Sequence, residues 1–255
     1  MLDKITSAIT DIKNTKPLIL CLTNVVTMDF MANSLLALGA APIMSCEEKE
    51  LEELIKISHA INLNIGTLES DFIRRCRVAA EIAKYQKKPI ILDPVGAGAS
   101  LIRTQSAQEL MHFANVIRGN ASEIMALIDT QISTAGVEST CTTTVAKHSA
   151  NQLASTHNST VVVSGEEDYI TNGHQQESLM FGSSIMPMIT GMGCTLTAVI
   201  AAFCAVRSDA FEAATLATAY FGICGNLTER KTKLPGSFRT TFIDTLHNAN
   251  VEDIL

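Results

Sequence analysis

Two glycines and a cysteine stand at the start of a long apolar segment in the C-terminal third of the chain. Gly191, Gly193 and Cys194 belong to the run Thr190–Val199, and small apolar residues continue to Val206. Glycine tolerates positive φ and lets a ligand approach the backbone, while the first turn of a helix carries unpaired N–H donors and partial positive charge. The pattern predicts a turn that binds a phosphate or a developing oxyanion, with the thiol beside it.

The Cys194 thiol leaves more than one chemistry open. Its pKa, about 8.5 in a free cysteine, falls at a helix N-terminus, so the thiol could accept the proton of a substrate hydroxyl. As the nucleophile of a hydrolase it would need a histidine. None of the six histidines lies in a comparable turn, and the sequence does not show how far each lies from Cys194 in space. The alternative is a small buried side chain, as for Cys204 and Cys224, but the neighbouring glycines favour a functional thiol.

Short apolar runs in the N-terminal half are typical of buried strands, and candidate site residues stand at their ends. The runs are residues 18–22, 41–44, 60–65 and 89–92, and the candidates are Asn24, Met44, Asn64 followed by Gly66 with Thr67, and Asp93. Helical patterns separate these runs, which predicts a largely parallel sheet covered on both faces. Ligands of such sheets bind outside the carboxyl ends of the strands, so these residues are expected at one site.

The run Asp93–Ala99 places a carboxylate before a glycine-rich loop. An aspartate at a strand end is a usual magnesium ligand or base. A turn aspartate that caps the next helix is an equally good interpretation of the same spacing.

The next strand, from Val116, ends in a second polar cluster. Asn120 and Glu123 have the spacing of a capping box, in which each side chain bonds the other's backbone N–H. Arg118 is left unexplained by that motif, because a guanidinium at a buried strand end needs a phosphate or a carboxylate. We therefore expect an anion near Arg118.

The second half of the chain continues the sheet. Residues 161–163 are expected to be a strand that ends at Ser164, and Tyr169–Thr171 with Asn172-Gly173 indicates a hairpin, hence antiparallel strands on one side. Residues 129–143 are expected to be a loop. The helices expected along the chain are residues 2–12, 25–33, 47–57, 68–86, 145–156, 192–206, 211–230 and 235–246.

Composition restricts the class of function. The chain of 255 residues has 19 basic and 26 acidic residues, a net charge of −7 without a basic block, which argues against nucleic-acid and anionic-membrane partners. The seven cysteines form no CxxC pair and no secretory leader precedes them, which favours a reducing, cytoplasmic compartment. Residues 178–206 lack charge, but Pro187 and the two glycines interrupt them, so a buried helix is expected rather than a membrane span.

Several of these motifs together resemble the hydroxyethylthiazole kinase family of thiamine salvage. Each motif is short, but they follow one another in the family's order over nearly the whole chain. They are Asn24, residues 33–40 (NSLLALGA), 64–68 (NIGTL), 93–98 (DPVGAG) and 118–124 (RGNASEI), the Gly-x-Gly-Cys turn, and residues 235–238 (PGSF).

The resemblance implies a single domain over residues 1–255 with a ribokinase-like fold: three layers, α/β/α, around a mostly parallel sheet with antiparallel strands at one side. It implies a homotrimer with active sites at subunit boundaries. The implied reaction transfers the γ-phosphate of ATP to the hydroxyl of 4-methyl-5-(2-hydroxyethyl)thiazole with the help of Mg²⁺.

The resemblance also implies roles for single residues. Catalysis would involve Cys194, Gly191 and Gly193, and Cys194 stands where related ribokinase-like enzymes place an aspartate base. The remaining residues are expected to be substrate-binding (Met44, Gly191, Asn24, Gly66 and Thr67), ATP-binding (Arg118, Ser164 and Asn120) and metal-binding (Asp93 and Glu123).

Two positions depart from the family pattern. Ser164 replaces the usual threonine and keeps the hydroxyl, and Met192 adds bulk between the two glycines. Three rival interpretations stay open: a cysteine hydrolase, a kinase of the same fold for another small alcohol such as a hydroxymethylpyrimidine or a sugar, and a nucleotide sensor without catalysis.

Overall fold

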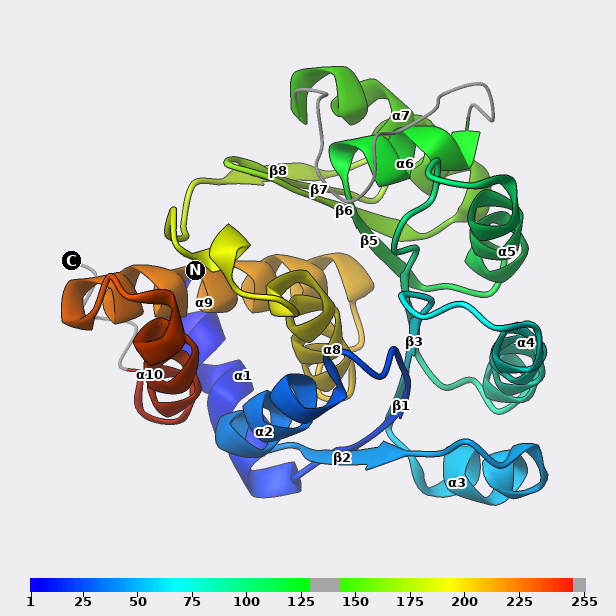
Figure 1. The fold of residues 1–255 in the computed structure, drawn as a ribbon, viewed down its shortest axis with the longest axis horizontal. Coiled ribbons are helices and arrows are strands. Elements are labelled where there is room, and N and C mark those ends of the chain that lie inside the picture. The colour runs from blue at the N-terminus through cyan, green and yellow to red at the C-terminus, as the bar shows by residue number, and fades with distance from the viewer. Residues whose placement is uncertain (129–142, 250–255) are drawn as a thin grey trace.

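The computed structural model describes residues 1–128 and 143–249, and these residues form three layers around one sheet (Figure 1). The eight strands lie in the order β2-β1-β3-β4-β5-β6-β7-β8. The pairings from β2 to β6 are parallel, and β6–β7 and β7–β8 are antiparallel. The strands are β1 (Leu18–Leu22), β2 (Ala41–Met44), β3 (Ala60–Asn64), β4 (Ile90–Asp93), β5 (Val116–Asn120), β6 (Thr160–Ser164), β7 (Asp168–Thr171) and β8 (Gln176–Leu179).

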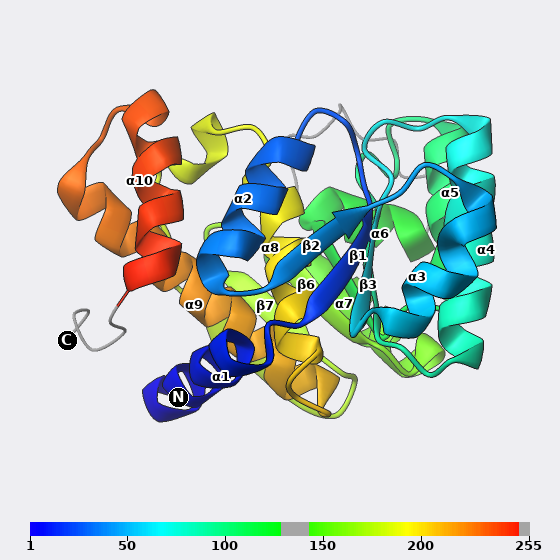
Figure 2. The same cartoon turned by 90° about the horizontal axis from the view of Figure 1, so that it is seen from below.

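Helices cover both faces of the sheet (Figures 1 and 2). One layer packs on the first face through a shared core. Its helices are α1 (Leu2–Thr15), α2 (Met28–Leu38), α8 (Met192–Cys204), α9 (Ala210–Lys231) and α10 (Pro235–Asn248). The other layer packs on the opposite face. Its helices are α3 (Leu51–Ile57), α4 (Ser70–Tyr85), α5 (Leu101–Met111), α6 (Ala121–Ile128) and α7 (Thr143–His157), and the 3₁₀ turns are Glu48–Glu50 and Met186–Met188.

Alternation along the strands decides which side chains face α8. Ile91 and Val116 belong to the core that contains α8, whereas Leu92 and Ile117 belong to the opposite core. Since side chains alternate with a period of two, Asp93 and Arg118 lie on the α8 face of the sheet. The carboxyl ends of β4 and β5 thus present Asp93 and Arg118 to the N-terminal end of α8.

The expected parallel sheet, the antiparallel hairpin at one side and the buried helix after Gly191 are confirmed. Some boundaries were wrong: α2 begins at Met28, and the expected helix over 47–57 is a 3₁₀ turn followed by the short α3. The sequence patterns did not predict α5. The loop expected over residues 129–143 lies outside the described residues, except that Thr143 begins α7.

The uncharged segment is not a membrane span. Its helix, α8, is 13 residues long, and in the part of the chain that the structure describes no helix has the length and hydropathy needed to cross a bilayer. Instead α8 is buried on all sides between the sheet and the helices α2 and α9 (Figure 1). A helix that is apolar all round is expected in such a position.

Candidate active site

The carboxyl ends of five neighbouring strands meet below the N-terminus of α8. Asn64 of β3 is the register partner of Asp93 of β4, and Asn120 of β5 is the partner of Ser164 of β6. Asn24 follows β1 on the other side of β3. The sheet therefore brings the polar strand ends together as expected from their sequence positions.

Asp93 is a buried carboxylate with one free oxygen. Its Oδ2 accepts hydrogen bonds from Asn64 Nδ2 and Thr197 Oγ1, both at 2.8 Å, and Arg118 Nη1 lies 3.9 Å from it. Its Oδ1 is buried and has no partner among the described residues. Burial raises the pKa of Asp93, and Arg118, Thr197 and Asn64 lower it by less. The carboxylate does not cap α5, whose N-cap is Ser100, so the alternative interpretation as a capping residue is wrong.

Glu123, in the first turn of α6, joins two loops. Its Oε2 accepts from the backbone N–H of Asn120 at 2.9 Å, and Asn120 Oδ1 accepts in return from the N–H of Glu123 at 2.9 Å. The capping box is therefore complete. Its Oε1 accepts from the N–H of Gly96, in the loop after Asp93, at 2.8 Å. Burial, and then the charge of Asp93, raise the pKa of Glu123 to about 7 against the effect of these N–H groups.

Arg118 lies against the start of α8. Its Nε donates to Ser164 Oγ at 2.9 Å, and its side chain is 13% exposed. A Cβ added at Gly193 would stand 2.5 Å from Nη1 of Arg118, so the missing side chain of Gly193 makes room for the guanidinium. A cation is unfavourable at a helix N-terminus unless an anion joins it. The guanidinium and the first turn of α8 therefore form one anion-binding position.

Gly191 turns the chain into α8. It is the N-cap residue with φ of 97°, and a Cβ there would stand 3.0 Å from Cβ of Thr27. Both the conformation and the close contact exclude a side chain. Glycine is thus required at the two positions for different reasons: Gly191 adopts a positive φ, and Gly193 leaves space for the Arg118 guanidinium.

Asn24 connects the strand ends to the thiol. Its Nδ2 donates to Asn64 Oδ1 at 2.8 Å and to Cys194 Sγ at 3.4 Å, and its Oδ1 accepts from Thr27. A Cβ at Gly66 would stand 2.8 Å from Asn24 Nδ2, so Gly66 must be small for the amide to lie there. These contacts hold Asn24 in one orientation between β1 and β3.

The remaining expected contacts lie beside Asn24. Thr67 Oγ1 accepts from the N–H of Val25 at 3.2 Å and so joins the loops after β1 and β3. Met44 ends β2, one strand further out, in register with Cys21 of β1 and partly buried against the core around α8.

Cys194 does not have the lowered pKa expected of a helix N-terminus. Burial, and then the charge of Asp93, raise the pKa of the thiol, outweighing the hydrogen bonds with Asn64 and Thr27 and the charge of Arg118. The charge and desolvation of its surroundings exceed the effect of the helix end. The thiol is therefore protonated at neutral pH, which also argues against a hydrolase nucleophile.

The donor set suits a magnesium ion better than a soft metal. Asp93 and Glu123 supply carboxylate oxygens, and the unpartnered Oδ1 of Asp93 is an acceptor without a donor. In the described ranges no group of three or more His, Cys, Asp or Glu side chains could hold a metal ion. Mg²⁺ commonly uses one or two carboxylates and completes its shell with water and substrate phosphates. The residues present therefore fit Mg²⁺ accompanied by a nucleotide.

Sequence reasoning missed some residues that the structure adds to the site. Asn64 was noted only as a strand end, yet it bonds Asn24, Asp93 and the N–H of Gly66. Thr197 lies within the apolar run and was not singled out. Its position four residues after Gly193 places its hydroxyl on the helix face that meets Asp93. Arg103, in α5, gave no signal because its partners are backbone carbonyls.

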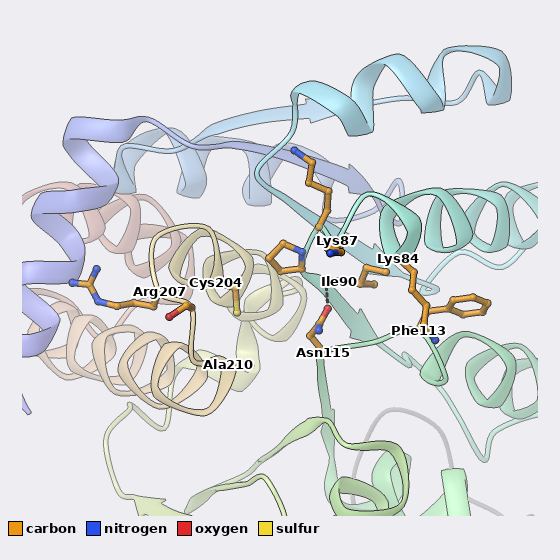
Figure 3. Close-up of a pocket in the computed structure, with 11 residues that line it drawn as sticks. Lys84, Lys87, Ile90, Phe113, Asn115, Cys204, Arg207 and Ala210 are labelled. Atoms are coloured by element: carbon orange, nitrogen blue, oxygen red, sulfur yellow. Dashed lines mark hydrogen bonds between the residues drawn. The ribbon is translucent and has the colours of Figure 1, made fainter.

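A cavity lies at the opposite, amino-terminal edge of the sheet. This cavity of about 420 Å³ is lined by the loop before β4, the residue before β5 and the segment between α8 and α9 (Figure 3). It contains three lysines and an arginine, but Arg207 points toward α1 and pairs with Asp11 at 2.7 Å. Lys84 and Lys88 donate to backbone carbonyls, and Asn115 accepts from the N–H of Ile90, so most of its polar side chains are engaged in structural contacts and it is a weaker candidate site.

The comparisons with known proteins agree with the geometry. The model of the "Hydroxyethylthiazole kinase family" matches residues 9–252. The chain is 45% identical over 254 residues to the hydroxyethylthiazole kinase of Chlamydia caviae, covering 99% of this chain and 97% of that protein.

The solved structures give the same result. The hydroxyethylthiazole kinase of Pyrococcus horikoshii superposes with a TM-score of 0.91 at 37% identity, covering 99% of this chain and 97% of that chain. A ribokinase-like superfamily protein of Enterococcus faecalis has a TM-score of 0.63 at 15% identity, with 92% and 88% covered, which supports the fold alone. The three-layer ribokinase-like architecture is thereby confirmed.

Proposed function

We propose, since the chain belongs to the hydroxyethylthiazole kinase family, that it transfers the γ-phosphate of ATP to the hydroxyl of 4-methyl-5-(2-hydroxyethyl)thiazole. The product is the thiazole phosphate used in thiamine phosphate synthesis. One observation carries the proposal: the buried carboxylate of Asp93 meets Arg118 and the first turns of α8 through Oδ2, while its Oδ1 has no partner among the described residues. The match over residues 9–252 and the single continuous sheet support one catalytic domain over the whole chain.

The nucleotide would bind on the side of β5 and β6. Arg118 and Ser164 are held together by their hydrogen bond, and Asn120 ends the same strand as Arg118. Phosphoryl transfer requires positioning and charge stabilisation more than covalent chemistry. The guanidinium of Arg118 and the N–H groups of the turn with Gly191 and Gly193 would stabilise the charge on the transferred group.

The alcohol would bind on the side of β1 and β3. Gly66 and Thr67 lie along the border of this region. Asn24 is fixed beside the thiol, and Met44 offers an apolar surface at the end of β2. Gly191 packs against Thr27, close to this region, and begins α8. A thiazole ring is flat and weakly polar, so a small apolar wall with one oriented amide suits it.

Asp93 and Glu123 would hold Mg²⁺, Glu123 through water because both of its oxygens already accept backbone N–H groups. When bound, the ion would neutralise charge on the phosphates. The raised pKa of each carboxyl would then fall, because a nearby divalent cation favours the ionised form.

Cys194 would act as a neutral neighbour of the substrate hydroxyl. Its raised pKa makes the thiolate scarce at neutral pH. The loose transition state of phosphoryl transfer asks little of a base. We therefore assign Cys194 to orienting the hydroxyl, with the aspartate of related enzymes replaced by a weaker group.

A homotrimer with sites at subunit boundaries would cover apolar residues next to the site. Val25 and Val26 directly follow Asn24 and are 72% and 67% exposed, and Met188, before the turn into α8, is 69% exposed. Exposed apolar side chains beside a ligand site are typical of an interface. Light scattering on the purified protein would test the trimer.

We also propose a cytoplasmic location. The described cysteines are free thiols, and several of them are buried in the core, which suits a reducing compartment.

The function is tested by ADP release with a panel of acceptors. Protein with ATP and Mg²⁺ should release ADP only when the thiazole alcohol is present. Turnover that is faster with a hydroxymethylpyrimidine or a sugar would indicate the related kinase, nucleotide binding without turnover would indicate the sensor, and thiol-dependent ester cleavage without ATP would indicate the hydrolase. A ligand-dependent melting screen with the same alcohols checks the ranking.

A further inference from the structure

Arg103 in the first turn of α5 reaches into the space between two site loops. Its Nη1 donates to the carbonyl of Ile65 at 3.0 Å and to that of Val95 at 2.9 Å, and its Nη2 donates to the carbonyl of Gly66 at 2.9 Å. The first and third carbonyls belong to the loop after β3, and the second belongs to the loop after β4. One guanidinium therefore ties both loops together.

The bonding pattern requires an arginine. Within residues 1–128 and 143–249 no ion pair joins Arg103 to a carboxylate, so its charge faces carbonyl dipoles. A guanidinium presents several N–H groups in a rigid fork, whereas an ammonium is a compact point charge on a flexible stem. A lysine here could satisfy one loop but could not hold the two at a set separation.

The loop after β4 is shaped around this side chain. Gly96 has φ of 77°, and a Cβ there would stand 3.0 Å from Cδ of Arg103. Gly96 also donates its N–H to Glu123 Oε1 at 2.8 Å. A displacement of Arg103 would therefore move Gly96, and with it the hydrogen bond that Gly96 donates to Glu123, one of the proposed metal carboxylates.

The loop after β3 leads to the other half of the site. Gly66 donates its N–H to Asn64 Oδ1 at 3.0 Å, and Asn64 bonds both Asn24 and Asp93. The same guanidinium that sets Gly96 thus sets Gly66, which bounds the proposed alcohol position.

We infer that Arg103 is a positioning residue for phosphoryl transfer: it sets the separation between the loop after β3, which lies beside the proposed alcohol position, and the loop after β4, which follows Asp93 and donates a hydrogen bond to Glu123. The inference rests on the proposed function. The two reactants must align closely, and a displacement of about 1 Å can cost on the order of 10²-fold in rate. Arg103 touches neither reactant in this arrangement and acts through Gly66 and Gly96.

The test compares Arg103→Lys and Arg103→Ala with wild type, and uses Arg77→Ala as a control. Arg77 is an exposed arginine of α4 that pairs with Glu81 and Glu109 away from the site. We expect kcat to fall on the order of 10²-fold in Arg103→Ala and by an intermediate factor in Arg103→Lys. The KM for ATP should change little, because Arg118 and Ser164 lie on other strands. Millimolar guanidinium should restore part of the activity of Arg103→Ala alone.

A second readout follows the loops themselves. Hydrogen exchange should become faster at residues 65–67 and 94–98 in Arg103→Ala, and should stay unchanged in Arg77→Ala. Unchanged kcat in folded variants, or a loss that follows only the folded fraction without guanidinium rescue, would overturn the inference. Wild-type protein without thiazole-dependent ADP release would overturn the proposed function as well, so the two failures are distinguishable.

Discussion

The two edges of the sheet both carry charged side chains, yet these charges are bonded differently. At the amino-terminal edge the half-buried Lys88 donates to the carbonyls of Lys56 and Ser58 at 3.1 and 2.6 Å, and the exposed Lys84 donates to the carbonyl of His112 and lies over the ring of Phe113. At the carboxyl edge Oδ1 of Asp93 has no partner among the described residues, and Arg118 Nη1 lies 3.9 Å from the other oxygen, Oδ2. Charged groups whose hydrogen bonds go to the protein's own backbone serve the structure. A buried polar atom without a hydrogen-bond partner instead indicates that a ligand binds there.

Asp93→Asn should produce the largest effect on turnover. The asparagine keeps hydrogen-bond partners for Asn64 and Thr197 but removes the charge, so kcat should fall on the order of 10²- to 10⁴-fold. Because burial raises the pKa of Asp93, the neutral side chain should fold at least as stably. Steady-state kinetics and thermal melting check both. A collapse of the melting temperature would make Asp93 structural.

Gly193→Ala should come next, because the added carbon would stand 2.5 Å from Arg118 Nη1 and push the guanidinium aside. We expect a loss of about 10- to 100-fold in kcat/KM for ATP. The control is Gly236→Ala in α10, where no atom lies within 4 Å of the added carbon. Equal activity in both variants would remove Arg118 from the proposed phosphate position.

Lys88→Met, at the amino-terminal edge, should lower stability and leave turnover unchanged, the reverse of Asp93→Asn. Loss of the two hydrogen bonds should lower the free energy of unfolding by about 1–3 kcal/mol, with kcat unchanged. Urea denaturation and the ADP assay measure the two quantities. A loss of turnover in fully folded Lys88→Met would show that the cavity in Figure 3 takes part in function.

Cys194→Ser should have a small effect. The raised pKa keeps the thiol protonated, so a serine hydroxyl preserves the neutral contact, and kcat should fall less than about 10-fold with an unchanged pH profile. If the thiolate were the base, the variant would instead lose on the order of 10²-fold or more and its activity would no longer rise with pH.

Asp168 offers the smallest effect, on stability alone. It begins β7, accepts from the N–H of Gly165 at 3.1 Å, and burial raises its pKa from 3.8 to about 6. A pKa raised by folding gives a contribution that is complete below the unfolded value and is lost as pH rises through the folded value. The unfolding free energy of wild type relative to Asp168→Asn should therefore fall between pH 3.8 and about 6. A difference that stays constant with pH would contradict this.

The sequence predicted those residues of the candidate site that lie at the ends of strands. It did not predict contacts that depend on packing between distant elements. Asp93 and Arg118 could be found because short apolar runs mark strands, and parallel strands share one carboxyl edge. The partners of Arg103 are backbone carbonyls, which have no sequence signature. The expected lowering of the Cys194 pKa was wrong because burial and the charge of Asp93 outweigh the helix terminus, and neither can be read from neighbours in the chain.

The paired assay of Asp93→Asn and Lys88→Met tests the comparison most directly. Thiazole-dependent ADP release and melting temperature are measured on both variants under one set of conditions. We expect a crossover: Asp93→Asn loses turnover and keeps its melting temperature, and Lys88→Met keeps turnover and melts lower. Activity and stability falling together in both variants would contradict it.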